Sequence, residues 1–390
     1  MANATVRQLL SPIVTTKVIS RVATAEMPLL AEFGMTPGGP CELPVGHRAH
    51  GYDVFNNSRS VGMTTMPGEA AKTVTRQAVG RVNVTIPRMH EQLPLSAEEL
   101  HNMRPIGGNS NVYDTLGTSF IRRQQRFMGQ RAANFRAVLL GGMMRGLAYA
   151  HPNGNDLYID YTSGTNLITY NWQMPSGNQN QLNMLGAGNI ITGYWSSSAT
   201  DIPTQFELID IAMQNLVGIG LQRIVCGAQL WSYITANDFV AMKAGISNTP
   251  FSEYTRRPSG TIEAPSNLKI GRLACTPWLE FIITDTVLQL GKQTAENPGT
   301  GSSSYTKTKL VADGSFWFGP RTPDPFFFEM AIGSEPIAEG PNQNPVVKMG
   351  LSAWTTWQWN PTATLLFALD NAFPCNYVPY ASGYATAYGY

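Results

Sequence analysis

The chain has 390 residues, of which 43% are hydrophobic and only 14% carry a charge, with 27 Lys and Arg against 26 Asp and Glu. This composition excludes a disordered or collagen-like chain, and the length suffices for two or three domains that each bury a core. Charges are scarce relative to the roughly 25% that is usual for soluble domains, so uncharged polar residues must cover much of the surface. Such a surface favours association over mutual repulsion.

The two parts of the chain carry opposite net charge. Residues 1–150 contain 16 Lys and Arg and 9 Asp and Glu, which gives +7, whereas residues 151–390 contain 11 and 17, which gives −6. Copies of the chain would therefore attract one another head to tail. A nucleic-acid-binding domain would concentrate more positive charge in one compact patch, so this segregation favours contacts between subunits.

Cysteine usage and apolar runs indicate neither a metal site nor a membrane segment. The four cysteines lie 49 or more residues apart without a CxxC pair, and we expect structural thiols. The first 18 residues lack the basic start and unbroken apolar core of a secretory signal, so synthesis in the cytoplasm is expected. Two uncharged stretches, 161–200 and 349–369, are too rich in polar residues to supply about 20 apolar residues for a transmembrane helix.

The first two segments are expected to reach away from a core. Residues 1–45 predict an extended arm, because prolines at 28, 37, 40 and 44 and a Gly-Gly pair at 38 and 39 prevent a long helix. Residues 46–95 predict a long two-stranded hairpin, with alternating apolar residues from Val74 to Ile86 and a turn at MPGEAA. A hairpin of this length has little core of its own, so we expect it to be mobile unless another surface covers it.

Two helices are expected next. A short one begins at Ser96 with a capping-box pattern and ends before Pro105. Residues 114–141 contain no proline and predict a helix of about 42 Å. At 100° per residue its apolar side contains Leu116, Phe120, Phe127 and Val138, and the opposite side contains Arg122, Arg126 and Arg136. This arginine face would contact carboxylates of neighbouring subunits, phosphates of packaged nucleic acid, or solvent alone.

A second domain of about 140 residues, with helices and strands in alternation, is expected to begin near residue 201. It would contain a helix at 204–219, a buried strand at 223–227 and a third helix at 228–242. A short strand precedes it at 156–161. Later apolar runs are strand-like; they lie at 279–290, 308–319, 325–332, 350–359 and 363–370.

No motif predicts catalysis. The HEQLP string that begins at His90 lacks the second histidine of a zinc peptidase, and GAGNIITG at 186–193 has the wrong spacing for a dinucleotide or phosphate loop. No GxSxG elbow is present, and the five histidines all lie in the first 151 residues, where surface or turn positions are the favoured interpretation. We therefore predict no catalytic, cofactor-binding or metal-binding residue and no enzyme.

Eight strings, taken in order, carry a resemblance to a known family. They are YDVFNNSR (52–59), MPGEA (66–70), RVNVTIPRMHEQLPLSAEEL (81–100), RPIGG (104–108), FIRRQQRFMGQRAANFRAVLLGG (120–142), IDY (159–161), YWSSSATDIPTQFELIDIA (194–212) and RIVCGAQLW (223–231). The sequence resembles the major capsid proteins of tailed bacteriophages, which have the Hong Kong 97-type fold, and is nearest to the lambda-like capsid family. The likeness covers about two thirds of the chain and rests on order and spacing.

The resemblance implies an α+β fold with five parts. These are an N-terminal arm at 1–45, an extended loop at 46–95, a peripheral domain at 96–200 with a spine helix at about 114–148, an axial domain at 201–340, and a return to the peripheral domain with a C-terminal tail at 341–390. No long helical region precedes the arm, so a separate scaffolding protein is implied. The neutral stretch 161–200 is longer than the family's minimum and is expected to be a surface insertion.

The resemblance also implies the partners. Copies would form the pentamers and hexamers of an icosahedral shell in the virion, which encloses double-stranded DNA without sequence preference, with a portal, an optional decoration protein and no cofactor. We expect contacts between subunits at Arg76, Arg81 and Arg88 of the hairpin and at Arg122, Arg126 and Arg136 of the long helix. Two alternatives stay open. Eight Trp and fifteen Tyr suit a glycan-binding or glycan-hydrolysing protein, although paired acids are missing. A minor vertex or decoration protein of the virion is the other.

Overall fold

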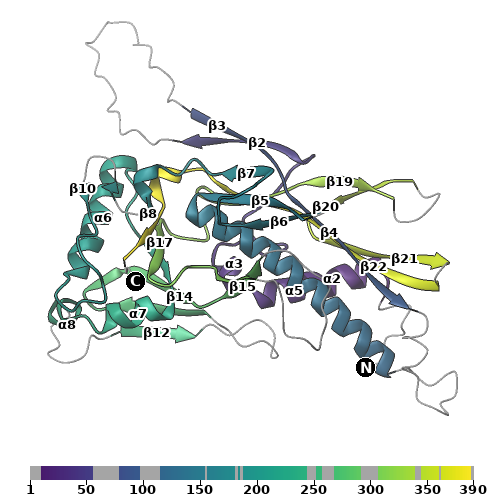
Figure 1. The fold of residues 1–390 in the computed structure, drawn as a ribbon, viewed down its shortest axis with the longest axis horizontal. Helices are drawn as coiled ribbons and strands as arrows, with labels where there is room; N and C mark the ends of the chain where they lie inside the picture. The colour runs from purple at the N-terminus through teal and green to yellow at the C-terminus, as the bar shows by residue number, and fades with distance from the viewer. Residues whose placement is uncertain are drawn as a thin grey trace, which may run out of the picture.

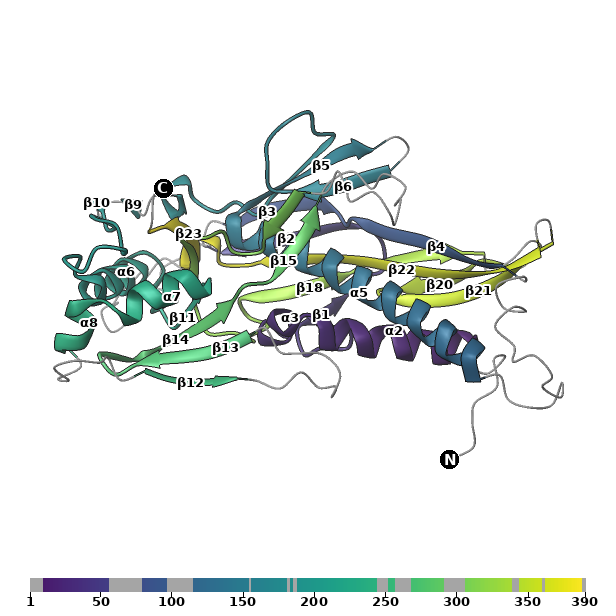
Figure 2. The same ribbon diagram turned by 60° about the horizontal axis from the view of Figure 1, so that its bottom comes forward.

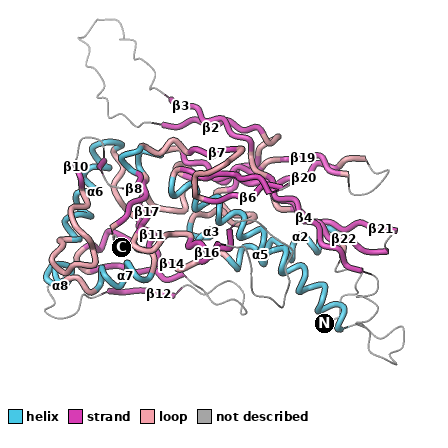
Figure 3. Tube along the Cα trace, in the orientation of Figure 1, coloured by secondary structure: helices cyan, strands magenta, loops and turns pink. Residues whose placement is uncertain are grey.

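The structure, a computed structural model, describes residues 10–55, 79–96, 115–153, 156–180, 183–184, 188–243, 252–256, 268–290, 306–338, 344–359 and 362–387. These residues form helices and strands around two hydrophobic cores, so the expected α+β class is confirmed. The molecule is elongated (Figure 1): β4, β21 and β22 lie at one end and α6, α7 and α8 at the other. Figure 3 shows the same separation by colour, with short helices at one end and long strands at the other.

A five-stranded sheet forms the centre of the first core. Its strands are β1 (Glu42–Pro44), β18 (Phe328–Ile332), β22 (Thr362–Asn376), β21 (Ser352–Trp359) and β4 (Arg88–Ser96). The long strand β22 pairs with β21 along one edge, with β4 along the other, and with β18 at its C-terminal end. β1 adds to β18 in parallel, so residues from the start of the chain complete a sheet made near its end.

The N-terminal residues are helical, and the expectation of an extended arm without a long helix is wrong for them. They form α2 (Pro12–Glu26) and α3 (Pro28–Glu32), which lie as a layer along one side of the five-stranded sheet (Figure 2). Each helix begins with a proline, which fits the first turn because its missing N–H has no intrahelical partner there. The prolines that predicted an extended arm all lie after α2 and do not interrupt it.

The long helix predicted from residue 114 is confirmed as α5 (Thr115–Arg145), but its predicted faces are wrong. Phe127, placed on the apolar side, is 41% exposed, whereas Gln125 and Arg136 are buried. The side that packs against α2 contains Gly129 and Gln125, whose Nε2 donates to Thr15 Oγ1 at 3.3 Å. A Cβ atom at Gly129 would lie 2.9 Å from the Ile19 carbonyl oxygen and 2.9 Å from Val22 Cβ, so only glycine permits this approach. Apolar periodicity therefore marked the wrong stripe, because close helix packing selects small residues over large ones.

A seven-stranded sheet separates the two cores. Its strands, in spatial order, are β12 (Ser252–Arg256), β13 (Leu268–Leu273), β14 (Thr276–Thr284), β11 (Arg223–Cys226), β17 (Ser315–Gly319), β23 (Gly383–Thr386) and β8 (Gln179–Asn180). Val225, Ile282 and Trp317 share one row and face the first core, whereas their sequence neighbours face the second. The central strands are thus buried on both faces, which explains their continuous apolar sequences.

The expected boundary of 201–340 does not follow the sheets. β8 and β23 lie outside that range and complete the seven-stranded sheet, whereas β18 lies inside it and belongs to the five-stranded sheet. The helices of the second core are α6 (Ile202–Val217), α7 (Ala228–Thr235) and α8 (Asp238–Lys243). The single helix predicted at 228–242 is wrong, because Asn237 ends one helix and caps the next. Its Oδ1 accepts from Phe239 N at 3.1 Å and its Nδ2 donates to Thr200 O at 2.9 Å.

Small sheets and turns complete the described part. The antiparallel pairs are β2 (Ala49–Phe55) with β3 (Val79–Thr85), β9 (Asn183–Met184) with β10 (Gly188–Asn189), β15 (Val287–Leu290) with β16 (Thr306–Lys309), and β19 (Ser334–Ile337) with β20 (Val346–Met349). A three-stranded sheet contains β5 (Leu147–Asn153), β6 (Asp156–Asp160) and β7 (Ile168–Asn171), and two 3-10 turns are Ser176–Asn178 and Pro379–Ala381. The predicted hairpin turn at 66–71 and the short helix after Ser96 lie outside the described residues.

The contact between α2 and α5 gives a first test. Gly129→Val would place methyl groups against Ile19 and Val22, and we expect a loss of about 1–3 kcal/mol in the free energy of unfolding from overpacking. Asn134→Val is the matched control, because it introduces the same valine side chain on the exposed side of the same helix. Urea denaturation of both variants measures the difference. Equal stability of the two variants would contradict the close packing described for α2.

Candidate functional site

Catalytic and metal-binding groups are the first kinds of site to consider. Among the described residues, no set of three or more His, Cys, Asp or Glu side chains is placed to hold a metal ion. All four cysteines are free thiols, and three of them are buried, as expected for structural residues. Within the same part of the chain, no helix combines the length and the hydropathy needed to cross a bilayer. The candidate sites are therefore charged clusters and surfaces.

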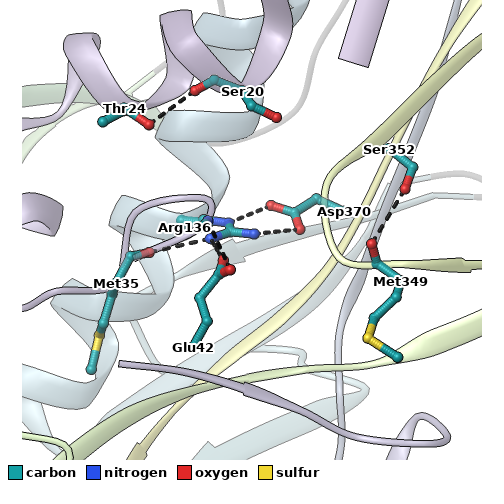
Figure 4. A network of polar contacts seen from close by, with 9 residues as sticks. Ser20, Thr24, Met35, Glu42, Arg136, Met349, Ser352 and Asp370 are labelled. Carbon is teal, nitrogen blue, oxygen red and sulfur yellow. Dashed lines mark hydrogen bonds and ion pairs between the residues drawn. The ribbon is translucent and has the colours of Figure 1, made fainter. Parts of the chain in front are cut away.

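A buried arginine of α5 joins three distant parts of the chain (Figure 4). Arg136 Nε donates to Asp370 Oδ2 at 2.6 Å and its Nη2 donates to Asp370 Oδ1 at 3.0 Å, which gives a bidentate pair with β22. Its Nη1 donates to Glu42 Oε1 at 2.6 Å and to the Met35 carbonyl oxygen at 3.2 Å. One guanidinium therefore holds the long helix, the long strand and the segment around β1 together.

The environment of Arg136 is dry. The arginine is 1% exposed and Asp370 is 0% exposed. Burial works against the charged form, but the charges and hydrogen bonds of Asp370 and Glu42 outweigh it and raise the pKa of Arg136. The predicted contact of Arg136 with a neighbouring subunit does not fit its position in the fold, because the side chain is 1% exposed and its guanidinium pairs with Asp370 and Glu42. Helical periodicity gives direction around the axis but not depth, and the C-terminal half of α5 is buried on nearly every side.

A second arginine ties the N-terminal segment to the seven-stranded sheet. Arg223, at the start of β11, donates through Nη1 to Thr322 Oγ1 at 2.5 Å and to the Glu32 carbonyl oxygen at 3.3 Å. Its Nη2 forms an ion pair with Glu280 on β14. Beside it, the Phe33 ring lies 5.2 Å from the Trp317 ring and 5.8 Å from the Phe328 ring, between centroids. Phe33 is thus packed between the two sheets, and β1 joins one of them, so the expectation that the whole arm reaches away from a core is wrong.

The hairpin arginines occupy different environments. Arg76 lies outside the described residues. Arg81 is exposed on β3 and stands opposite Asp53 of β2 in the register, on the side of the hairpin that faces away from Tyr52 and Val54 in the core. Arg88 of β4 is partly exposed, forms an ion pair with Glu335 at 3.1 Å, and donates to His90 Nδ1 at 2.8 Å. Contacts of these arginines with other subunits stay predictions.

The remaining arginines lie in the N-terminal half of α5, away from Arg136. Arg122 is exposed and Arg126 is half-buried. The two therefore share a surface at the far end of the helix that Arg136 does not join. The arginine face predicted from the sequence consequently divides into a surface part and a buried part, and only the surface part can meet another molecule.

The β19–β20 hairpin is a surface that the sequence reasoning missed. The register places Glu335 and Lys348 on its inner side, where Glu335 pairs with Arg88 and Lys348 Nζ lies 5.8 Å from the Trp354 ring centroid. Its outer side contains Val347, which is 64% exposed, and Met349, which is 46% exposed; Val346, on the same side as Lys348, is also 49% exposed. A hairpin in water normally has the opposite arrangement, with apolar residues inward. SEPI and VVKM do not alternate regularly between apolar and polar residues, so no sequence signal identifies the outer side of this hairpin.

A smaller apolar surface lies at the opposite end of the molecule, on α6. Leu208 is 43% exposed and Ile211 is 53% exposed, and their spacing of three residues places them on one side of the helix. The inner side of α6 packs into the second core through Phe206 and Ile209. The helix therefore has apolar residues on its core side and also on its outer side. Two neighbouring exposed apolar residues form a small patch, which distinguishes them from isolated exposed residues.

Comparisons with known proteins give similarity at low identity. No family model and no curated protein matches the chain. One similar structure is a prophage protein of E. coli CFT073 that is provisionally described as a capsid protein; it is 13% identical, with a TM-score of 0.46 and 79% of each chain covered. Another is a phage-related protein from Bordetella bronchiseptica RB50, 11% identical, with a TM-score of 0.45 and 97% of each chain covered. A virus-like particle from Pyrococcus furiosus is 6% identical, with a TM-score of 0.43 over 95% of this chain and 97% of the other.

The cluster around Arg136 makes a prediction about stability. Asp370→Asn leaves a buried guanidinium without its main counter-charge, and we expect a loss of about 3–5 kcal/mol in the free energy of unfolding. The double variant Arg136→Met with Asp370→Leu removes both charges and should recover most of that loss. Arg122→Met, on the exposed part of the same helix, should change it by less than about 1 kcal/mol. Chemical denaturation measures the free energy of unfolding of all three variants. If Asp370→Asn and the double variant lost the same amount of stability, the ion pair between Arg136 and Asp370 would be contradicted.

Proposed function

We propose that this chain is the shell-forming subunit, or major capsid protein, of a tailed bacteriophage. The observation that carries the proposal is the β19–β20 hairpin, which turns its charged side inward and its apolar side, Val347 and Met349, to the surface. Another molecule that covers the outer side of this hairpin would remove its apolar side chains from water and stabilise it further. The sequence resemblance supplies the identity of that molecule: another copy of the same chain.

The shape of the fold supports assembly from many weak contacts. Two of the exposed apolar surfaces lie toward opposite ends of an elongated subunit, one on the β19–β20 hairpin and one on α6. Within the described residues, β4 and β21 each pair only with β22, so each presents one edge without a strand partner. Unlike surfaces at opposite ends of one molecule lead to head-to-tail contacts, which close into rings when the rotation permits. Several such contacts for each copy give a stable shell.

The finer parts of the proposal follow from the resemblance. Copies form pentamers and hexamers of an icosahedral shell in the virion, which assembles with a separate scaffolding protein and a portal and encloses double-stranded DNA. The order of α2, the β2–β3 hairpin, α5 and the seven-stranded sheet along the chain supports the sequence of arm, extended loop, spine helix and axial domain. The subunit acts by forming contacts and contributes no catalysis.

The glycan alternative loses its main support. Trp172, Trp195 and Trp317 are each at most 1% exposed, and Trp354 is 2% exposed. A sugar-binding platform requires exposed aromatic faces, and these four rings are buried; among the described tryptophans Trp278, which is 43% exposed, is the exposed exception. The alternative of a minor vertex or decoration protein differs from the proposal only in copy number, which mass measurement of the particle determines.

Electron microscopy of the purified full-length chain, alone and with its scaffolding protein, tests the proposal. We expect closed shells from the natural sequence. Val347→Asp should raise the subunit concentration needed for assembly by at least about tenfold, because each contact loses roughly 1.5 kcal/mol of apolar burial. Val347→Ile, the matched control, should assemble normally. A compact monomer under every condition would refute the proposal.

The exposed arginines give a separate prediction. Reversal of Arg76, Arg81 and Arg88 to glutamate should impair shell formation while the melting temperature of the subunit stays within a few degrees.

Arg122→Glu combined with Arg126→Glu should disturb assembly more than DNA retention, because we place these residues at contacts between subunits. Sedimentation measures assembly, and nuclease-protected DNA measures retention. Normal shells that lose their DNA would instead assign Arg122 and Arg126 to the phosphates.

A further inference from the structure

A buried histidine, His151, lies between the three-stranded sheet β5–β6–β7 and the loop 161–167, which connects β6 to β7. His151 of β5 stands opposite Tyr158 of β6 on the side of this sheet that faces away from Ala148 and Ala150 in the first core. The loop passes over that side, and His151 is only 7% exposed beneath it. A buried histidine on the outer side of a peripheral sheet requires an explanation.

Both ring nitrogens of His151 point at oxygen atoms. Nδ1 lies 3.1 Å from the Thr165 carbonyl oxygen. Nε2 lies 2.8 Å from Asp160 Oδ1 and 3.1 Å from the Thr162 carbonyl oxygen. Neither carbonyl can donate a proton, and an ionised carboxylate accepts only. Both nitrogens must therefore donate at once, which only the doubly protonated imidazolium can do.

The neutral ring fits this site poorly in either tautomer. With the proton on Nε2, the Nδ1 lone pair faces the Thr165 carbonyl oxygen. With the proton on Nδ1, the Nε2 lone pair faces the Asp160 carboxylate. Each tautomer thus loses one set of hydrogen bonds and gains a repulsion between lone pairs, so deprotonation of His151 weakens the attachment of the loop.

The two ends of the loop are held independently of His151. Tyr161 Oη donates to the Val138 carbonyl oxygen of α5 at 3.0 Å, and the Leu167 amide donates to the Ala150 carbonyl oxygen at 2.9 Å. Between these points, the Thr162 and Thr165 carbonyl oxygens both lie on the His151 ring. The Thr162 amide also donates to Asp160 Oδ1 at 3.0 Å, so the Thr165 carbonyl oxygen is the contact in the middle of the loop that depends most on His151, while the ends stay fixed to the core.

Among the residues that the structure describes, few charged or titratable groups face His151. Asp160 of β6 is the charged one, and the rings of Tyr158 of β6 and Tyr149 of β5 lie 5.2 Å and 6.4 Å from the His151 ring, between centroids. Burial opposes the charged form, but hydrogen bonds to Thr165, Asp160 and Thr162 outweigh it and raise the pKa of His151 above 6.5. A raised pKa means that the stabilisation is complete below about pH 6.5 and is lost as the pH rises through the pKa of the folded state.

We propose that His151 is a proton-operated latch, which holds the loop 161–167 against the β5–β6–β7 sheet and releases it when the imidazolium loses a proton. Release would free residues 162–166, while Leu167, which is 67% exposed, stays attached through its amide. The surface formed by residues 162–166 thereby changes with pH. The latch is a property of the single subunit and holds whether or not the subunit forms a shell.

Hydrogen exchange of the full-length chain, followed by mass spectrometry, tests the latch. After correction for the intrinsic pH dependence of exchange, a peptide that covers 161–168 should be protected at pH 6 and should lose at least about fivefold of its protection by pH 8.5. A peptide from the buried half of α5 serves as the internal reference and should not change. Equal protection of the loop peptide at both pH values would overturn the proposal.

Three variants separate the latch from a general effect of pH. His151→Gln cannot titrate, so the loop peptide should show low protection that no longer depends on pH. Asp160→Asn removes the carboxylate charge and should move the midpoint of the change to lower pH by about one unit or more. His90→Gln, which alters an exposed histidine on β4, is the control and should keep the natural profile. A pH dependence that survives in His151→Gln would assign the effect to another group and refute the latch.

Discussion

The structure depends on one buried charge that must be neutralised. Arg136 can be accommodated in the first core only while Asp370 and Glu42 lie against it, and these three residues come from α5, β22 and the strand that follows α3. An unpaired guanidinium at that depth would cost several kcal/mol, so the correct arrangement of the three elements is strongly favoured over near alternatives. Arg223 applies the same constraint at the seven-stranded sheet, and residues 27–45 are fixed from both sides. The cores are joined by polar contacts at two points and by a shared sheet between them.

Much of the fold could be predicted from local sequence. The long helix, the buried strand at Arg223 and the late strands follow from proline spacing and apolar runs, which act over a few residues. The predictions that failed concerned depth and partners. The sequence near Pro28 indicates a helix breaker but does not reveal that α2 precedes it, and periodicity does not show that Gly129 faces α2 while Phe127 faces outward. Those outcomes depend on residues more than 100 positions away.

The candidate surfaces show the same limit. The sequence shows where arginines lie along a helix but not how deeply they are buried. Only the fold shows that Arg136 is buried in ion pairs within the subunit, whereas Arg122 is exposed. The β19–β20 hairpin was hidden for a different reason: its apolar side is short, and only its pairing with Arg88 and Trp354 shows which side is inward. His151 carries no sequence signal, since its role arises from two carbonyl oxygens that the loop places on its ring.

The pairing of β1 with β18 also sets the order of events during synthesis. Glu42 leaves the ribosome long before its partner Met330 and the carboxylate of Asp370. Until those residues emerge, a nascent chain carries α2 and α3 without the strands that bury them. The first core is completed only after β18 and β22 have been made, and apolar residues such as Phe33 are accessible to chaperones until then.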